Sequence, residues 1–402
     1  MTPLRSVASR FVSTRSSSWS PRLASSWSPR PGSPSDRRSR PAWRPVATLV
    51  AAALTTALLA GAAAPATASV ATWVAGSATP RAASVADTRG LFGAEDPQYD
   101  GVYRQAAAIL GLHAVGVPVP PSAVTWLLRQ QCPNGSFAAF RANPQAPCPP
   151  PDPAAFSGPD TNSTAMAAMA LAALSAGRSP SGRVAQAAMR ARHWLARQQL
   201  PGGGWEWIAG LRPDSTSTAM ALATLSGQAP GRVLKGTRWL QRQVDVSADC
   251  GVLFQPGTNS DPLSTAWAFL SLSGPLPYNA YSGPRAPVSC TDRRVAGAGA
   301  WLESTLTAGN GTIPSAYDPA ATDWNATALA ALSLSQRRGS AQTMNLAVSA
   351  LQANVDDYSS GTGGDRPAAL GTLIMVAHAT GVDPADFGGV DLPARLLATL
   401  RG

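Results

Sequence analysis

The apolar positions of this chain form helix-sized segments of two alternating kinds. In residues 160–174, DTNSTAMAAMALAAL, almost every position after the first turn is apolar or small, which predicts a helix buried on all sides. In residues 194–205, WLARQQLPGGGW, arginine and glutamine separate the apolar positions. This second pattern predicts a half-exposed amphipathic helix that ends in a glycine turn. The chain is therefore expected to be all-α.

Both kinds of segment recur along the chain. Buried helices are predicted to start near residues 100, 160, 214, 261, 323 and 365, and half-exposed helices near residues 120, 181, 231, 292, 341 and 391. The first buried helix has no half-exposed helix before it, and the last half-exposed helix has no buried helix after it. A ring would pair these two, so we predict an α6/α6 toroid of six inner and six outer helices. An open solenoid is the alternative.

Each buried segment opens with an aspartate, and four of them share the pattern D-x-x-[SA]-T. A carboxylate at a helix N-cap accepts a hydrogen bond from a backbone N–H and complements the positive helix end, so capping is its simplest role. The inner helices of a ring run in one direction, so their N-termini gather at one mouth of its cavity, where the same groups would hydrogen-bond a ligand. The candidate ligand-binding residues are Asp160, Thr164, Asp214, Thr218, Asp261, Thr265, Trp267, Asp323, Trp324, Thr327 and Asp365. No catalytic residue is predicted.

The glycine turns suggest how neighbouring repeats are joined. Trp194 is expected to anchor an outer helix, Gln199 to bond the backbone of the turn, and Trp205 to pack on a neighbouring repeat. Residues 126–137, WLLRQQCPNGSF, are a second copy, and three further copies keep the helix and a glycine but lose the rest. The glycine run at residues 202–204 is therefore predicted to be a turn and not a phosphate-binding loop.

These segments resemble the repeated Gln-Trp motif, W-L-x3-Q-x3-G-x-W, of the squalene cyclase and protein prenyltransferase repeat superfamily. Residues 194–205 match it, and residues 126–137 match it with phenylalanine in the last place. The resemblance covers residues 95–402 and implies the terpenoid cyclase-like α/α toroid, a fold that the cobalamin carrier proteins also share. It implies no single activity, because one fold hosts several.

The chemistry of the two enzyme classes in that superfamily is not found in this sequence. The cyclases carry a D-x-D-D acid, whose nearest counterpart here is residues 354–357, NVDD, interpreted as a solvated loop. The prenyltransferases use Asp, Cys and His ligands to zinc, and the predicted inner helices contain no cysteine. Neither a metal nor a cofactor is therefore predicted.

Three functions remain open. A non-catalytic binding protein would take an amphipathic molecule or, by resemblance to the cobalamin carriers, a corrinoid such as cobalamin. A terpenoid cyclase-like enzyme would need a non-standard acid. A surface scaffold or interaction module would use the ring only as a stable framework for an unknown surface partner.

The basic charge of the chain belongs largely to its first segment. Of 32 basic and 22 acidic residues, residues 1–68 hold nine arginines and one aspartate, which leaves 23 basic and 21 acidic residues elsewhere. Lys235 is the only lysine, so no nucleic-acid partner is expected.

The first segment itself predicts export. An apolar run at residues 46–64 precedes Ala66-Thr67-Ala68, which is typical of a signal peptide with a long basic n-region, cleaved after Ala68. An uncleaved membrane anchor is the alternative. Residues 69–94 are expected to be a flexible segment before the toroid domain at 95–402. The mature protein is expected to be a secreted monomer with no stable membrane anchor.

An oxidising compartment makes the four cysteines candidates for disulfides. Four cysteines allow three connectivities, and we predict the sequential one, Cys132–Cys148 and Cys250–Cys290. Each bridge would close a loop between two helices.

Overall fold

The computed structural model of the chain describes residues 88–177, 179, 181–245, 249–279, 295–316, 318–336 and 340–402. Every described residue belongs to one compact unit, which lies within Leu59–Gly402. This described part is mostly helical and of the α/α toroid-like class. The predicted signal peptide and its cleavage site lie outside the described residues.

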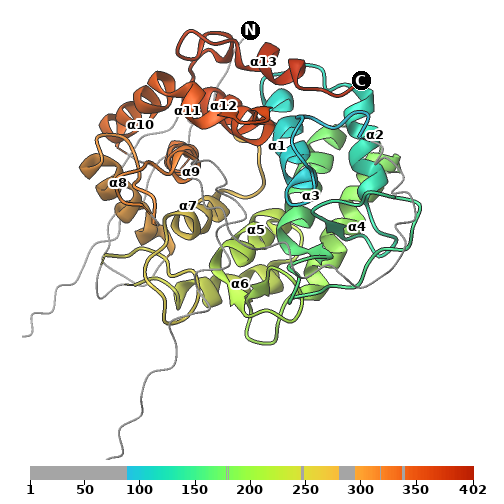
Figure 1. The fold of residues 1–402 in the computed structure, drawn as a ribbon. Helices are drawn as coiled ribbons and strands as arrows, with labels where there is room; N and C mark the ends of the chain where they lie inside the picture. The colour runs from blue at the N-terminus through green and yellow to red at the C-terminus, as the bar shows by residue number, and fades with distance from the viewer. Residues whose placement is uncertain are drawn as a thin grey trace, which may run out of the picture. The chain divides into compact units, whose positions relative to one another are not determined.

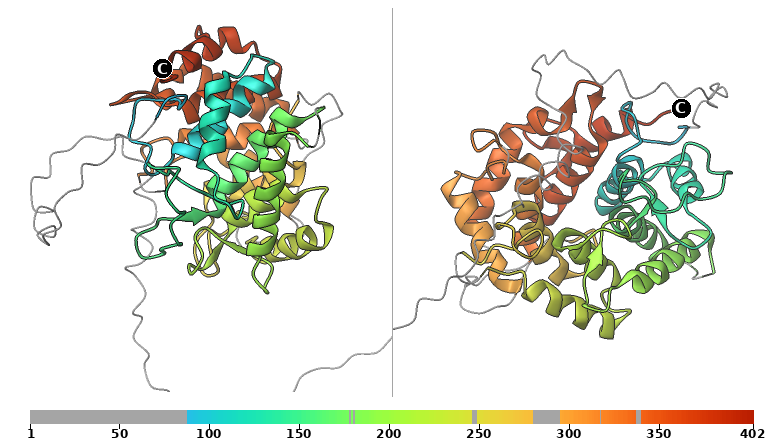
Figure 2. Two further views of the ribbon diagram at one scale, coloured as in Figure 1. Left: turned by 90° about the vertical axis from the view of Figure 1, so that its right-hand side faces the viewer. Right: turned by 60° about the horizontal axis from the view of Figure 1, so that its bottom comes forward.

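Six helices surround a common centre (Figure 1). They are α1 (Gly101–Ala114), α3 (Thr161–Ser175), α5 (Ser215–Leu225), α7 (Pro262–Leu270), α9 (Trp324–Gln336) and α12 (Pro367–Thr380). Each packs on the next in this order, and α12 packs on α1. All begin within two residues of a predicted aspartate, as the apolar pattern indicated. Two further views show the same circular arrangement (Figure 2).

A second set of helices lies outside the first. They are α2 (Pro121–Gln130), α4 (Arg183–Gln198), α6 (Pro230–Gln241), α8 (Ala298–Ala308), α10 (Ala341–Ala353) and α13 (Leu392–Ala398). Each packs on the inner helix that precedes it in the chain. One further helix, α11 (Val355–Ser359), was not predicted, and three 3-10 turns occupy Ser271–Ser273, Val295–Gly297 and Pro384–Asp386. Among the described residues, no helix combines the length and the apolar character needed to span a membrane.

Three very short antiparallel strand pairs lead into inner helices. They are β1 (Phe137–Ala138) with β2 (Pro159–Asp160), β3 (Trp205–Glu206) with β4 (Pro213–Asp214), and β5 (Ser360–Gly361) with β6 (Gly364–Asp365). The pairs place the end of each glycine turn beside the start of the next inner helix. Two-residue strands have no periodicity, so the sequence pattern did not reveal them.

The predicted glycine turn at residues 194–205 is confirmed. The side-chain amide of Gln199 donates to the carbonyl of Gly203 at 2.9 Å and to the carbonyl of Arg232, on the next outer helix, at 2.9 Å. Gly203 has φ 102°, and a Cβ there would lie 2.6 Å from the carbonyl oxygen of Lys235. Only glycine fits this position, because both the φ angle and the close helix backbone exclude a side chain.

Trp205 ends this turn inside the core. It is fully buried, and its indole N–H donates to the carbonyl of Leu195 at 2.7 Å. A Cβ on Gly236 would lie 2.8 Å from the ring, so the tryptophan packs directly on the following outer helix, α6. The expected packing of Trp205 on a neighbouring repeat is therefore confirmed.

The two ends of the described chain pair with each other. Gly90 N–H donates to the carbonyl of Arg401 at 2.9 Å, and Arg401 N–H donates to the carbonyl of Leu91 at 2.9 Å. The C-terminus accordingly lies beside α1 and α2 (Figure 1). Leu91 and Phe92 are fully buried, so packing begins several residues before the expected domain start at residue 95.

Glycines allow α1 and α12 to meet closely. A Cβ on Gly111 would lie 2.8 Å from the Cα of Gly371, and a Cβ on Gly371 would lie 2.4 Å from the carbonyl oxygen of Ala107. These two helices therefore pack backbone against backbone, which completes the circle of inner helices. We call this contact, together with the paired chain ends, the seam.

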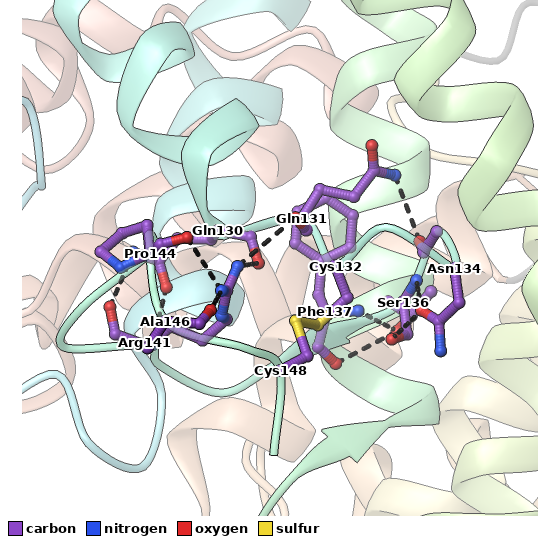
Figure 3. The surroundings of a disulfide bond; sticks show 12 residues. Gln130, Gln131, Cys132, Asn134, Ser136, Phe137, Arg141, Pro144, Ala146 and Cys148 are labelled. Carbon is purple, nitrogen blue, oxygen red and sulfur yellow. Dashed lines mark hydrogen bonds between the residues drawn. A yellow bond between two sulfur atoms is a disulfide. The ribbon is translucent and has the colours of Figure 1, made fainter. Parts of the chain in front are cut away.

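The Cys132–Cys148 disulfide is confirmed, with the two Cα atoms 5.9 Å apart. Beside it, the Arg141 guanidinium donates to the carbonyls of Pro144 and Ala146 at 2.9 and 2.6 Å (Figure 3). Both contacts hold the loop between β1 and β2. Cys290 lies outside the described residues, and so does the predicted Cys250–Cys290 bridge.

Candidate functional site

The N-terminal ends of the inner helices hold most of the predicted ligand-binding residues, and we call this end of the inner helices the mouth. Four aspartates cap helices here. The Asp160, Asp214, Asp261 and Asp323 carboxylates accept backbone N–H groups of Ser163, Ser217, Ser264 and Ala326 at 2.7, 2.7, 2.6 and 2.8 Å. The predicted capping role is therefore confirmed for these four residues.

Asp365 differs from the other four. The N-cap residue of α12 is Arg366. The Asp365 carboxylate instead pairs with the guanidinium of Arg395 on α13, with Oδ1 and Nη2 2.7 Å apart. The inner helix thus starts two residues after the aspartate, at Pro367. Its carboxylate is committed to an ion pair with an outer helix.

The four predicted threonines tie each glycine turn to the next inner helix. Thr164 illustrates the arrangement: its hydroxyl accepts the Phe137 N–H at 2.9 Å and donates to the Asp160 carbonyl at 2.6 Å. Thr218, Thr265 and Thr327 accept in the same way from Trp205, Val252 and Ile313, each at 2.9 Å. All four are fully buried. Their ligand-binding role stays a prediction, and their observed contacts are internal.

Burial changes the acidity of the capping carboxyls. It raises the pKa of Asp160 to about 6 and that of Asp214 to about 7. It also raises the pKa values of Asp261 and Asp323. The charge of Asp261 adds to the increase at Asp214 and at Asp323. A cluster of carboxyls with raised pKa values is typical of functional sites, although capping alone also buries a carboxyl.

The second residue of several inner helices keeps part of its surface exposed. Asn162, Leu263 and Asn325 are half-buried, and so is Trp324 at the start of α9. One helical turn further on, the side chains fill the space between the helices. Met166, Met220, Trp267 and Leu329 are each at most 3% exposed. The mouth is therefore a shallow surface above a filled interior.

Two tyrosines complete one side of the mouth, and the sequence pattern did not indicate them. The Tyr358 hydroxyl, from α11, donates to the Asn325 Oδ1 at 3.1 Å. Burial raises the pKa of Tyr358 and of Tyr103 on α1 well above its usual value. The only sequence signal was the irregular copy of the repeat after Leu351, where the inserted helix α11 carries Tyr358.

Asp356 and Asp357, the nearest counterpart of the cyclase acid, are exposed. Asp356 pairs with Arg395 at 2.6 Å. The expectation of a solvated pair is confirmed, but the pair lies in α11 and not in a loop. In the described part of the chain, no three His, Cys, Asp or Glu side chains are grouped to hold a metal ion.

Two surface depressions lie away from the mouth. One, of about 580 Å³, lies beside the C-terminal ends of α1 and α12 and is lined by residues including Val115, His378 and Asp383. The other, of about 600 Å³, lies between the C-terminal ends of α1 and α3 and is lined by residues including His113 and Leu174. Neither includes a predicted ligand-binding residue.

No protein-family model and no curated protein matches this chain. Solved structures with similar folds include the type II terpene cyclase MstE from Scytonema, 19% identical over 72% of this chain and 76% of the other, with a TM-score of 0.42. The ent-copalyl diphosphate synthase from Streptomyces platensis is 18% identical over 70% of this chain and 50% of the other, with a TM-score of 0.46. The GH76 α-mannanase BT2949 from Bacteroides thetaiotaomicron is 10% identical over 69% and 86%, with a TM-score of 0.45. At these low identities and TM-scores, the similarity supports no conclusion about family or activity.

Proposed function

We propose that this protein is a non-catalytic ligand-binding toroid, with six inner and six outer helices, whose ligand docks on the mouth. The observation that carries the proposal is the set of buried carboxyls with raised pKa values beside half-exposed asparagine and tryptophan side chains. Such a surface offers hydrogen-bond acceptors next to apolar area. That combination suits an amphipathic molecule or a corrinoid such as cobalamin, and no catalytic cofactor is proposed.

The filled interior favours binding over catalysis in this proposal. A cyclase must enclose its substrate away from water, whereas Met166, Met220 and Trp267 occupy the space below the mouth. Each capping carboxylate is also engaged by a backbone N–H. A ligand that rests on the mouth needs neither an internal cavity nor a free acid.

One observation favours acid catalysis as a second candidate. Burial, with a smaller contribution from the neighbouring charge of Asp261, raises the pKa of Asp214 to about 7. A carboxyl that keeps its proton near neutral pH is what a class II cyclisation requires. An enzyme of this kind would have to open the space now filled by Met220 and Trp267.

The proposal also includes export. The Cys132–Cys148 disulfide supports an oxidising compartment. We propose that the chain is secreted as a monomer after cleavage behind Ala68.

The test is a binding measurement on the purified chain with cobalamin and with farnesol as defined probes. Thermal shift at ligand concentrations up to about 1 mM should raise the melting temperature with at least one probe, because a ligand that binds only the folded state stabilises it. Isothermal titration should then give a one-to-one stoichiometry.

Two variants locate the binding site. Asn325→Ala should weaken binding, because Asn325 is half-buried at the mouth. Asn345→Ala is the matched control, since Asn345 is exposed on the outer helix α10. If both variants lose the same amount of binding affinity, the mouth is not the binding site. Release of a cyclised product from farnesyl or geranylgeranyl substrates would replace the binding proposal with the catalytic one.

A further inference from the structure

Positive charge is concentrated on two neighbouring outer helices, α4 and α6. Neither helix contains an acidic residue, whereas α8 and α10 together contain one acidic residue and no basic one. Basic and acidic residues nearly balance over residues 69–402, so this is a local excess. We call the exposed surface of α4, α6 and the glycine turn that follows α4 the basic face. Its exposed cations are Arg183, Arg190 and Arg197 on α4, and Arg232, Lys235 and Arg238 on α6.

The spacing of the cations places them on the outward side of each helix. Arg183, Arg190 and Arg197 follow one another at intervals of seven residues, which is about two helical turns. All three are exposed, while Trp194 and Leu195 on the same helix are buried against the core. The helix therefore separates its charges from its packed side.

α4 and α6 follow each other around the outside of the inner helices (Figure 1). The glycine turn after α4 lies against α6, because Gln199 donates to the carbonyl of Arg232 at 2.9 Å. The guanidinium of Arg242, the C-cap residue of α6, donates back to the carbonyl of Gly202 at 3.1 Å. These contacts join the two helices into one charged surface.

Carboxylates do not neutralise this surface. In the described part of the chain, none of the six exposed cations lies within ion-pair distance of a carboxylate. Arg190 donates to the Gln131 Oε1 at 2.6 Å, and Arg197 donates to the Asn134 carbonyl at 3.2 Å. Both acceptors are neutral, so the basic face keeps its full charge.

Each helix of the basic face also exposes one large apolar side chain. Met189 is 48% exposed and Leu234 is 52% exposed, and each precedes a cation in the sequence. A soluble polyanion would pair with the cations and leave both apolar side chains in water. The headgroup layer of a membrane receives both kinds of group, because apolar side chains insert between the lipids while cations contact the phosphates.

We propose that the basic face binds the surface of a membrane that contains anionic phospholipid. Guanidinium groups pair with phosphate oxygens through two parallel hydrogen bonds. Each cation near such a surface adds to the attraction. Met189 and Leu234 insert among the headgroups, so the contact is peripheral and reversible. The proposal does not rest on the function proposed for the mouth, because no mouth residue lies on α4 or α6.

The test is cosedimentation of the purified full chain with vesicles of phosphatidylcholine that contain about 30% phosphatidylglycerol. The chain should bind these vesicles and should be released as the salt concentration rises, because salt screens charges at a surface. Vesicles of phosphatidylcholine alone should bind it at least about tenfold more weakly. Residues 1–68 hold nine arginines, so every variant is made in the chain of the same length.

Removing charge from the basic face should weaken vesicle binding. Arg183→Gln, Lys235→Gln and Arg238→Gln combined should weaken it at least about tenfold, and Arg238→Gln alone about threefold to fivefold. Arg212→Gln is the matched control for the single change, because Arg212 is also exposed but lies in the loop between β3 and β4. It should bind as the unsubstituted chain does. The melting temperature of each variant should stay the same, because exposed charges contribute little to stability.

Leu234→Gln tests the apolar part of the contact and should weaken vesicle binding about threefold. The proposal is overturned if the anionic vesicles do not bind the chain, or if the triple variant binds them as tightly as the unsubstituted chain. It is also overturned if Arg212→Gln costs as much affinity as Arg238→Gln. Binding of duplex DNA that is lost in the triple variant and unchanged in Leu234→Gln, without vesicle binding, would assign the basic face to a soluble polyanion instead.

Discussion

Two joints between neighbouring repeats, one continuous and one at the seam, share a common geometry. In the continuous joint, Gly203 lies against the backbone of α6 and Trp205 N–H donates to the Thr218 hydroxyl at 2.9 Å. At the seam, Gly90 lies against the backbone of α2 and Phe92 N–H donates to the Gln105 Oε1 at 2.9 Å. The spacing from glycine to aromatic residue is the same in both.

The two joints differ in which segments of the chain form the turn and the outer helix. Residues 90–92, Gly-Leu-Phe, complete a turn whose outer helix, α13, comes from the other end of the chain. At the seam, one repeat is therefore formed jointly by the two ends of the described chain. There, Gln105 alone fills the roles that Thr218 and Gln199 share in the continuous joint, where Gln199 donates to the carbonyls of Gly203 and Arg232 at 2.9 Å. Gln105 also donates to the carbonyls of Gly90 and Ala123 at 2.8 and 3.0 Å.

The largest expected effect is at Gln105. Gln105→Ala removes the partner of three buried backbone groups and leaves a cavity, so we expect the free energy of unfolding to fall by about 4 kcal/mol. Urea denaturation measures it. A loss no larger than that of Thr218→Val would mean that the seam is not held differently from the continuous joint.

A smaller loss is expected where α1 meets α12. Gly371→Ala would place a Cβ 2.4 Å from the carbonyl oxygen of Ala107, and separating the helices should cost about 3 kcal/mol. Gly231→Ala is the matched control: it lies in α6 with no atom within 4 Å of the added Cβ, so it should stabilise the protein by up to about 1 kcal/mol. Equal effects would contradict the close packing at the seam.

Raising the pH should lower the stability contributed by a buried carboxyl at each joint. Burial raises the pKa of Asp214 at the continuous joint to about 7 and that of Asp100 at the seam to about 6. Because both values lie above the unfolded value near 4, the folded state binds more protons between pH 4 and 7. Their contribution to stability is complete below pH 4 and is lost as the pH rises to 7.

We therefore expect the free energy of unfolding to fall as the pH rises through this range, by about 3 kcal/mol from Asp214. Asp214→Asn keeps a capping side chain and should flatten the slope. Urea denaturation at pH 5 and pH 8 measures the change. An unchanged slope in this variant would show that Asp214 is ionised in the fold as it is in the unfolded chain.

The smallest effect is expected within the continuous joint. Thr218→Val keeps the shape of the side chain and removes the acceptor for Trp205 N–H, so we expect a loss of about 1 to 2 kcal/mol. Thermal unfolding should show it. Thr265→Val makes the same change in the next repeat and should cost a similar amount, because Val252 N–H bonds Thr265 at the same 2.9 Å. If neither variant lowers the melting temperature, the threonine hydroxyls do not help to hold neighbouring repeats together.

Much of the fold could be predicted from the sequence because it is repeated. The alternation of apolar and amphipathic segments located every inner helix, and the residue types at Gln199 and Asp160 indicated their local roles in a turn and a cap. These are short-range features, which the sequence carries directly.

The parts that escaped prediction depend on distant contacts. Gly-Leu-Phe at residues 90–92 repeats the glycine-to-aromatic spacing of the other turns. This spacing could have indicated that the chain ends meet. The role of Gln105 could not be predicted. It accepts the N–H group that a threonine accepts in the other repeats, but it lies one position later in its helix. The raised pKa of Asp214 follows from burial by other repeats, which no single segment specifies.

The chain ends complete a repeat and so close the ring whose mouth carries the candidate site. Amide hydrogen exchange tests it directly, because the N–H groups of Gly90, Gly93 and Arg401 are bonded only when the ends pair. We expect these amides to exchange as slowly as that of Trp205, through global unfolding. Rapid exchange at Gly90 and Arg401 with continued protection of Trp205 would show an open chain of repeats and contradict closure.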